Sequence, residues 1–142
     1  MGKNTEGSNK TFMNLEQYIR EISSKTFSAR VISLADKPMN VGSIENPDGH
    51  GRITGECGDT MEIFIRISGK RIATISFLTD GCGATLACGS AVTELARGKT
   101  ISDAESVNVL SVLDYLDDLP PSHEHCALLA VKTLHGALRG LK

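Results

Sequence analysis

An alternation of apolar and polar residues between Met61 and Ser68 limits most strongly what this chain can fold into. Apolar side chains occupy every second position of this segment: Met61, Ile63, Ile65 and Ile67. A period of two is typical of a β-strand with one buried face. The turn Ser68-Gly69-Lys70 follows, and extended character resumes over 71–78, so we expect an antiparallel hairpin. A short strand over 51–55 would complete a small antiparallel sheet of about three strands.

Apolar residues elsewhere recur mostly at helical spacing. Pro38 ends one predicted helix and Gly98 ends another, while Pro120-Pro121 ends a third. Ser102 with Glu105 forms a capping-box pattern that starts this third helix, and a break in it near Asn108 stays open. The predicted helices cover 27–35, 83–97, 102–116 and a last segment from 124 or 125 to 138. Because strands come first and helices follow, we predict an α+β fold with the helices packed on one face of the sheet.

Length and composition favour a single small domain. The chain has 142 residues and 4% aromatic residues, so its core must be mostly aliphatic. Residues 1–12 are polar and predict a disordered N-terminus, and 13–142 form the expected domain. A net charge of −2 argues against nucleic acid as a partner. The chain has neither a span of ~20 apolar residues nor a secretory signal, which excludes a membrane protein and predicts a cytoplasmic one with reduced thiols.

Three of the four cysteines stand where the chain changes direction. Cys57 lies in a glycine-flanked turn before the main strand, Cys82 lies between the second strand and a helix, and Cys126 begins the last helix. Free N–H groups at a helix N-terminus lower the pKa of a thiol, which predicts this effect for Cys82 and Cys126. The thiolate is the form that attacks sulfur electrophiles and binds metals. The pattern therefore predicts a shared metal or sulfur site.

Other residues that could bind a metal have a second interpretation. Asp59 is either a ligand or a turn residue, and His125 is either a ligand or a polar residue at a helix start. His123 is either a further donor or part of a solvated loop. Cys88 falls on the apolar stripe of its helix and is predicted to be a core residue. His50 and His135 are expected either at the surface or as residues of secondary importance. No Cys-x-x-Cys pair supports a zinc ribbon or a thioredoxin-type motif.

Short blocks spread over residues 27–138 together resemble the IscU/NifU-type iron–sulfur cluster assembly scaffold family. The blocks occur in the family's order, and they are Met39-Asn40-Val41-Gly42, Cys57-Gly58-Asp59, Gly81-Cys82-Gly83, Gly98-Lys99-Thr100, Leu119-Pro120-Pro121 and His125-Cys126. The resemblance implies the fold of the NifU N-terminal domain. It also implies a scaffold without enzymatic turnover, which builds a [2Fe–2S] cluster from iron and sulfur and transfers it to apo iron–sulfur acceptor proteins.

The same resemblance implies roles for individual residues. Cys57, Cys82 and Cys126 correspond to the cysteine ligands of the cluster, and Asp59 or His125 completes the site. Cys126 matches the cysteine that accepts persulfide sulfur from a cysteine desulfurase. Zinc can occupy such a set of donors when the cluster is absent. The alternative function is therefore a zinc-bound, SufU-like activator of sulfur transfer. Two further hypotheses, a thiol-dependent enzyme and a metal-binding paralogue that releases no cluster, have less support.

Two departures from the family affect the expected partners. In the bacterial IscU form, an Hsp70-type chaperone recognises a Leu-Pro-Pro-Val-Lys segment. Ser122 and His123 replace the last two residues of this segment here, which argues against that partner. A predicted extra helix over about 13–25 precedes the usual start of the domain. This helix either covers a hydrophobic surface or mediates a homodimer, and both roles stay open.

Overall fold

The structure is a computed structural model that describes residues 27–141. The predictions of disorder over 1–12 and of a helix over 13–25 lie outside these residues. Three strands form one antiparallel sheet in the order β1-β2-β3, with β1 (Gly49–Thr54), β2 (Thr60–Ser68) and β3 (Arg71–Thr79). The helices are α2 (Ala29–Asp36), α3 (Gly83–Ala96), α4 (Ile101–Glu105), α5 (Val109–Tyr115) and α6 (Glu124–Arg139), and a 3₁₀ turn, η1 (Pro121–His123), precedes α6.

The predicted α+β fold and the predicted hairpin are confirmed. Met61, Ile63 and Ile65 are fully buried on the inner face of β2, as the alternation indicates. Their partners on β3 include Phe77, which lies opposite Ile63. The alternation stops near the far end of β2, where a shift in register between Arg66 and Ile67 interrupts the ladder.

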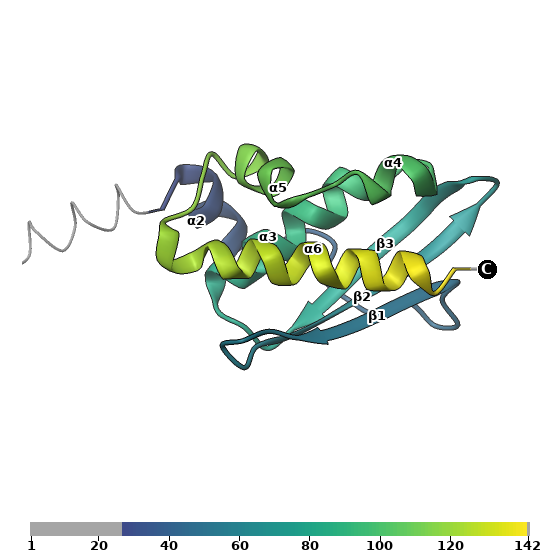
Figure 1. Cartoon of the computed structure of the whole chain (residues 1–142), viewed down its shortest axis with the longest axis horizontal. Helices are drawn as coiled ribbons and strands as arrows, with labels where there is room; N and C mark the ends of the chain where they lie inside the picture. Colours follow the sequence, from purple (N-terminus) through teal and green to yellow (C-terminus); the bar gives the residue numbers. More distant parts are fainter. Residues whose placement is uncertain (1–26, 142) are drawn as a thin grey trace, which may run out of the picture.

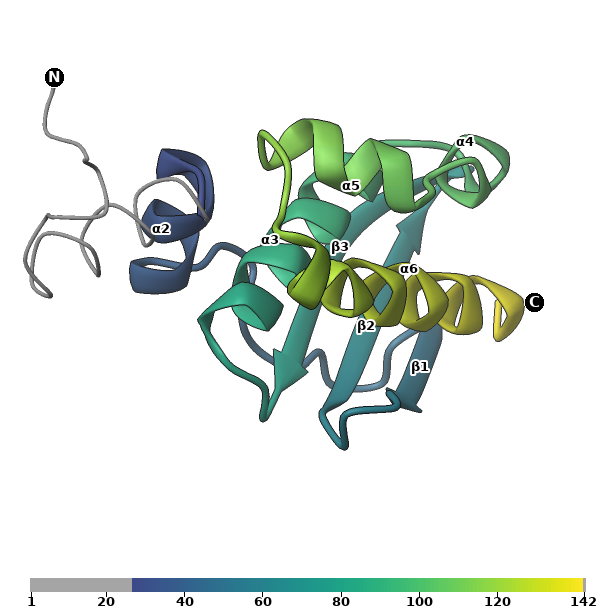
Figure 2. The same ribbon diagram turned by 60° about the vertical axis from the view of Figure 1, so that its left-hand side comes forward.

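The helices cover one face of the sheet, with α6 across β1 and β2 and α3 across β3 (Figures 1 and 2). Two glycines of β1 allow α6 to approach closely. A Cβ atom on Gly51 would lie 2.6 Å from the backbone nitrogen of Ala137 and from the carbonyl oxygen of Thr133. Since backbone atoms of α6 cannot give way, this position needs glycine. None of the helices within residues 27–141 is long and apolar enough to cross a membrane.

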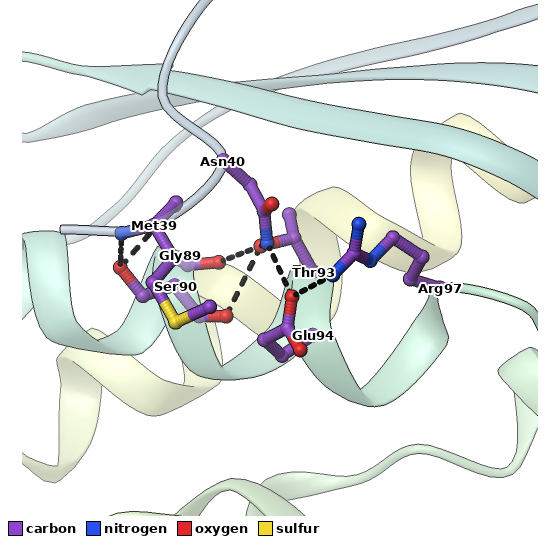
Figure 3. Close-up of polar contacts among 7 residues, drawn as sticks. All are labelled: Met39, Asn40, Gly89, Ser90, Thr93, Glu94 and Arg97. Atoms are coloured by element: carbon purple, nitrogen blue, oxygen red, sulfur yellow. Dashed lines mark hydrogen bonds and ion pairs between the residues drawn. The ribbon is translucent and has the colours of Figure 1, made fainter.

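The loop before β1 is fixed between the edge of β3 and α3 (Figure 3). The backbone of Phe77 donates to the carbonyl of Asn40 at 2.9 Å, and the N–H of Gly42 donates to the carbonyl of Phe77 at 2.9 Å. The side-chain amide of Asn40 donates to Thr93 Oγ1 at 2.9 Å and to Glu94 Oε2 at 3.1 Å. Asn40 adopts φ +63, a conformation that asparagine tolerates better than most residues. The loop thereby covers part of the free edge of the sheet.

The chain between α3 and η1 differs from prediction at one helix start. The capping box assigned to Ser102 and Glu105 is wrong, because Thr100 is the N-cap and accepts a bond from the N–H of Asp103 at 3.1 Å. Thr100 is held in extended geometry by a bridge to Arg71 at the start of β3, so the helix begins earlier. The break near Asn108 is confirmed, since Asn108 caps α5. The predicted third helix is therefore two short helices, α4 and α5.

Candidate metal and sulfur site

Three segments that carry the predicted site residues meet at one end of the sheet. They are the β1–β2 turn with Cys57 and Asp59, the β3–α3 junction with Cys82, and the start of α6 with His125 and Cys126 (Figure 1, left-hand side). The first two segments are tied together next to the cysteines. The N–H of Thr60 donates to Asp80 Oδ1 at 2.8 Å, and the N–H of Asp80 donates to the carbonyl of Thr60 at 3.3 Å.

Cys57 lies at the tip of the β1–β2 turn, as predicted. The N–H of Gly55 donates to the carbonyl of Asp59 at 2.8 Å and closes the turn. Gly58 has φ +93, which a residue with a side chain rarely adopts. The thiol of Cys57 is exposed. The turn thus presents this thiol to solvent.

Cys82 is the N-cap residue of α3, and its thiol is also exposed. Burial by itself would raise the pKa of this thiol, but the backbone N–H and hydroxyl of Thr85 and the backbone of Ala84 favour the thiolate. Together they lower the pKa of Cys82 below that of an ordinary thiol. The predicted effect of the helix N-terminus is confirmed for this cysteine.

Cys126 is the third residue of α6 and points inward, with an exposed fraction of 1%. Burial raises the pKa of the Cys126 thiol, and the negative charges of Cys82, Cys57 and Asp59 raise it further, although a hydrogen bond from Thr85 opposes them. The prediction that both helix starts lower a thiol pKa is therefore wrong for Cys126. Loss of solvation outweighs the favourable end of the helix.

The hydroxyl of Thr85 stands between these groups, and our sequence analysis missed it. Thr85 Oγ1 lies 3.4 Å from Asp59 Oδ2, 3.5 Å from Cys126 Sγ and 3.8 Å from Cys82 Sγ. It brings together side chains from the β1–β2 turn, α3 and α6. The available signal was its position three residues after Cys82 in the first turn of a helix, where side chains of similar spacing share one face.

Within residues 27–141, neither of the two histidines near the site bonds to the Thr85 hydroxyl, although His125 contacts Cys126. His125 is exposed, and its Nε2 lies 3.7 Å from Cys126 Sγ. His123 is half-buried; its ring contacts Phe27 edge-on at 4.9 Å between centroids and stacks on His125 at 6.3 Å. His123 therefore packs in the structure instead of lying in a solvated loop.

Cys88 lies in the core near Cys82 and Cys126, and the two remaining histidines make other contacts. Cys88 is fully buried in the hydrophobic core, as predicted, and burial raises the pKa of its thiol far above the ordinary value. His50 is exposed and bonds to Glu62 at 2.9 Å, in agreement with prediction. His135 is half-buried and not at the surface, and its Nε2 lies 2.9 Å from the carbonyl of Val107, which fits the second of its two expected roles.

The chemistry of the donor atoms fits a soft or borderline metal, although the donor side chains do not surround a common point in this structure. Within residues 27–141, no three His, Cys, Asp or Glu side chains stand close enough together to hold a metal ion. Three thiols and one carboxylate nevertheless suit zinc or an iron–sulfur cluster, and Cys57 lies near enough to affect the charge state of Cys126.

A small α+β domain that places three thiols and a carboxylate at one end of its sheet defines a class of metal- and sulfur-handling proteins. Comparison with known proteins agrees with this class. The family model described as NifU-like N terminal domain matches residues 26–142. The chain therefore belongs to the NifU-like N-terminal domain family.

Similar proteins in other organisms extend this result. The chain is 40% identical over 113 residues to an Archaeoglobus fulgidus protein named iron–sulfur cluster assembly scaffold protein IscU 1, covering 79% of this chain and 74% of that protein. It is 34% identical over 121 residues to the Escherichia coli K12 protein named iron–sulfur cluster assembly scaffold protein IscU, covering 82% of this chain and 94% of that protein.

Solved structures show the same fold. A Fervidobacterium islandicum AW-1 protein, described as an iron–sulfur cluster assembly scaffold for the SUF system, aligns with a TM-score of 0.67 at 22% identity, covering 82% of this chain and 98% of that one. The N-terminal part of a nitrogen-fixing NifU-like protein from Brucella abortus aligns with a TM-score of 0.66 at 14% identity, covering 84% and 96%.

Proposed function

We propose that this protein is a scaffold on which an iron–sulfur cluster is assembled and from which it is transferred to apo-proteins, without enzymatic turnover. The observation that carries the proposal is the meeting of Asp59, Cys82 and Cys126 around one buried hydroxyl, beside the exposed turn of Cys57. The names of relatives at 34–40% identity support the same role. The partners are a cysteine desulfurase and apo iron–sulfur acceptor proteins, and the cytoplasm is the expected location.

The cargo in this proposal is a [2Fe–2S] cluster held by Cys57, Cys82, Cys126 and a fourth donor. The side-chain positions favour Asp59 over His125 for this role. The Asp59 carboxylate contacts the hydroxyl that also contacts Cys82 and Cys126, whereas within residues 27–141 the His125 ring contacts Cys126 alone of the three cysteines. A hard carboxylate among soft thiolates weakens the hold on the cluster, which suits a protein that must release its cargo.

Cys126 is the proposed acceptor of sulfur. Its thiolate would attack the outer sulfur of a persulfide on the desulfurase, forming a new S–S bond while the old one breaks and the desulfurase cysteine leaves as a thiolate. The buried, protonated thiol of Cys126 has to be uncovered and deprotonated for this step. The neighbouring His125, with Nε2 3.7 Å from the sulfur, is a group that could take the proton.

The alternative function is a zinc-bound activator of sulfur transfer. Three thiolates and one carboxylate form a suitable tetrahedral set for zinc. In that case zinc would keep Cys126 unreactive until the desulfurase displaces it. The same residues serve both functions, so the two differ in cargo and not in the location of the site.

Anaerobic reconstitution with ferrous iron, cysteine and a desulfurase tests the proposal. A scaffold gains visible charge-transfer bands, and these bands pass to an apo-ferredoxin on mixing. Cys57→Ser, Cys82→Ser and Cys126→Ser should each abolish or destabilise the coloured species, whereas the matched core variant Cys88→Ser should retain it. A protein that stays colourless, retains zinc and stimulates the desulfurase is the activator instead. Equal damage from Cys88→Ser would contradict the ligand assignment.

A further inference from the structure

Thr85 occupies the centre of the proposed site without being a ligand of the usual kind. Its side chain is fully buried, and its hydroxyl is within 3.4–3.8 Å of Asp59, Cys82 and Cys126. Those three residues come from the β1–β2 turn, the N-cap of α3 and the first turn of α6. A hydroxyl that reaches all three can hold the separate segments in one arrangement.

The hydrogen bonds of Thr85 differ from those of the other buried hydroxyls on the helices. Ser90, Thr93 and Thr133 each donate to the carbonyl four residues earlier in their own helix, at 3.0, 2.7 and 2.7 Å. The residue four positions before Thr85 is Gly81, which precedes α3. Within residues 27–141, the side-chain partners of the Thr85 hydroxyl are all members of the proposed site.

The position of the Thr85 side chain is fixed by its packing. A Cβ atom on Gly81 would lie 2.6–2.8 Å from Oγ1, Cβ and Cγ2 of Thr85. The chain therefore needs a glycine at the end of the β3–α3 junction to leave room for this threonine. Such close packing keeps the hydroxyl directed at Asp59 and Cys126, in the manner of the outer groups that orient metal ligands.

We propose that Thr85 is a positioning residue of the metal site, which orients Cys126 and Asp59 by hydrogen bonding and retains one of these bonds when both bind metal. A hydroxyl has one proton to donate, so the sulfurs of Cys126 and Cys82 and the Asp59 carboxylate are alternative acceptors. A thiolate or carboxylate that binds metal keeps a free lone pair, so Cys126 or Asp59 can still accept this proton when both are ligands. This inference rests on the proposed function, because it assumes that Cys126 and Asp59 are ligands.

Cobalt(II) binding to the anaerobic, metal-free full chain is the test, with Thr85→Val and Thr85→Ser compared. Val keeps the shape of Thr but removes the hydroxyl, and Ser keeps the hydroxyl. Thr133→Val is the matched control, because Thr133 is equally buried but bonds to its own helix on α6. We expect Thr85→Val to weaken cobalt binding roughly tenfold or more, and Thr85→Ser and Thr133→Val to bind as the wild type does.

The thiolate-to-cobalt charge-transfer band separates positioning from packing. A hydrogen bond stabilises the sulfur lone pair from which the electron leaves, so its loss in Thr85→Val should move the band to longer wavelength. Wild-type affinity and an unmoved band in Thr85→Val would overturn the inference and leave the proposed ligands intact. Equal losses in Thr85→Val and Thr85→Ser with an unmoved band would overturn it as well. A wild-type protein without any such band would overturn the proposed ligand set, and this inference with it.

Discussion

Cys82 and Cys126 both stand at the start of a helix, yet the fold gives their thiols opposite properties. Cys82 is the exposed N-cap residue of α3, where nearby backbone N–H groups lower the pKa of its thiol. Cys126 lies inside the first turn of α6 with an exposed fraction of 1%, and burial raises the pKa of its thiol. A helix N-terminus therefore activates a thiol when water still reaches it, and burial decides the outcome when water does not.

This difference assigns separate tasks to the two cysteines in the proposed function. The exposed thiol of Cys82, whose pKa is lowered, loses its proton more readily than an ordinary thiol and so binds incoming metal more readily. Cys126, the proposed sulfur acceptor, stays protected from adventitious oxidation until a partner uncovers it. The side chain of Thr85 contacts both sulfurs and so links the two cysteines.

The rate of alkylation should show the largest difference between Cys82 and Cys126. With iodoacetamide and metal-free protein at pH 7.5, we expect Cys82 to react on the order of a hundredfold faster than Cys126, because exposure and thiolate fraction act in the same direction. Peptide mass spectrometry of timed samples measures both rates in one reaction, and the exposed Cys57 serves as an internal control for access. Equal rates for Cys82 and Cys126 would show that the thiol of Cys126 is not buried in solution.

Zinc should remove this difference. If Cys82 and Cys126 bind one metal ion, a single equivalent of zinc protects both from alkylation, and we expect each rate to fall about tenfold or more. A chelator should restore the original rates and the original order. Denatured protein provides the control, in which zinc leaves the two rates equal. Protection of Cys82 without protection of Cys126 would exclude Cys126 from the zinc site.

The pH dependence of alkylation should separate the two thiols in a known direction. Since the pKa of Cys82 is lowered, its rate should level off at a lower pH than that of a cysteine in an unfolded peptide. Since the pKa of Cys126 is raised, its rate should still be rising where the rate of Cys82 has become constant. Rate profiles from pH 6 to 10 check the direction of both pKa shifts. A midpoint shared by the two thiols would show that burial does not outweigh the helix terminus at Cys126.

The part of the structure that could be predicted from sequence depends on local periodicity. The alternation in β2 predicted a strand of the hairpin, and the apolar spacing along α3 predicted that Cys88 lies in the core. The burial of Cys126 was predictable on the same ground, because it precedes Ala130 by four residues and Leu134 by eight, on the stripe that faces the sheet. We assigned its environment from the helix terminus alone, and the stronger effect of burial was missed.

The remaining errors concern contacts between distant segments. The N-cap at Thr100 depends on a bridge to Arg71 in β3, which lies 29 positions earlier in the chain. The role of Thr85 depends on Asp59 and Cys126, which approach it from another turn and another helix. No local pattern records such pairs, because each segment is consistent with several arrangements until the sheet and helices pack together.

Removal of the Asp59 charge should have the smallest effect on the alkylation rates of Cys82 and Cys126. The carboxylate of Asp59 raises the pKa of both Cys82 and Cys126, and it is the weakest of the stated influences on each. Asp59→Asn keeps an oxygen that can accept the Thr85 hydroxyl while it removes the charge. We therefore expect both thiols to alkylate faster at pH 7.5, by about twofold, a fraction of one pKa unit. Asp114→Asn, on an exposed residue of α5, is the matched control. Slower alkylation of either cysteine in Asp59→Asn would show that the carboxylate acts on the thiols by holding the site together and not by its charge.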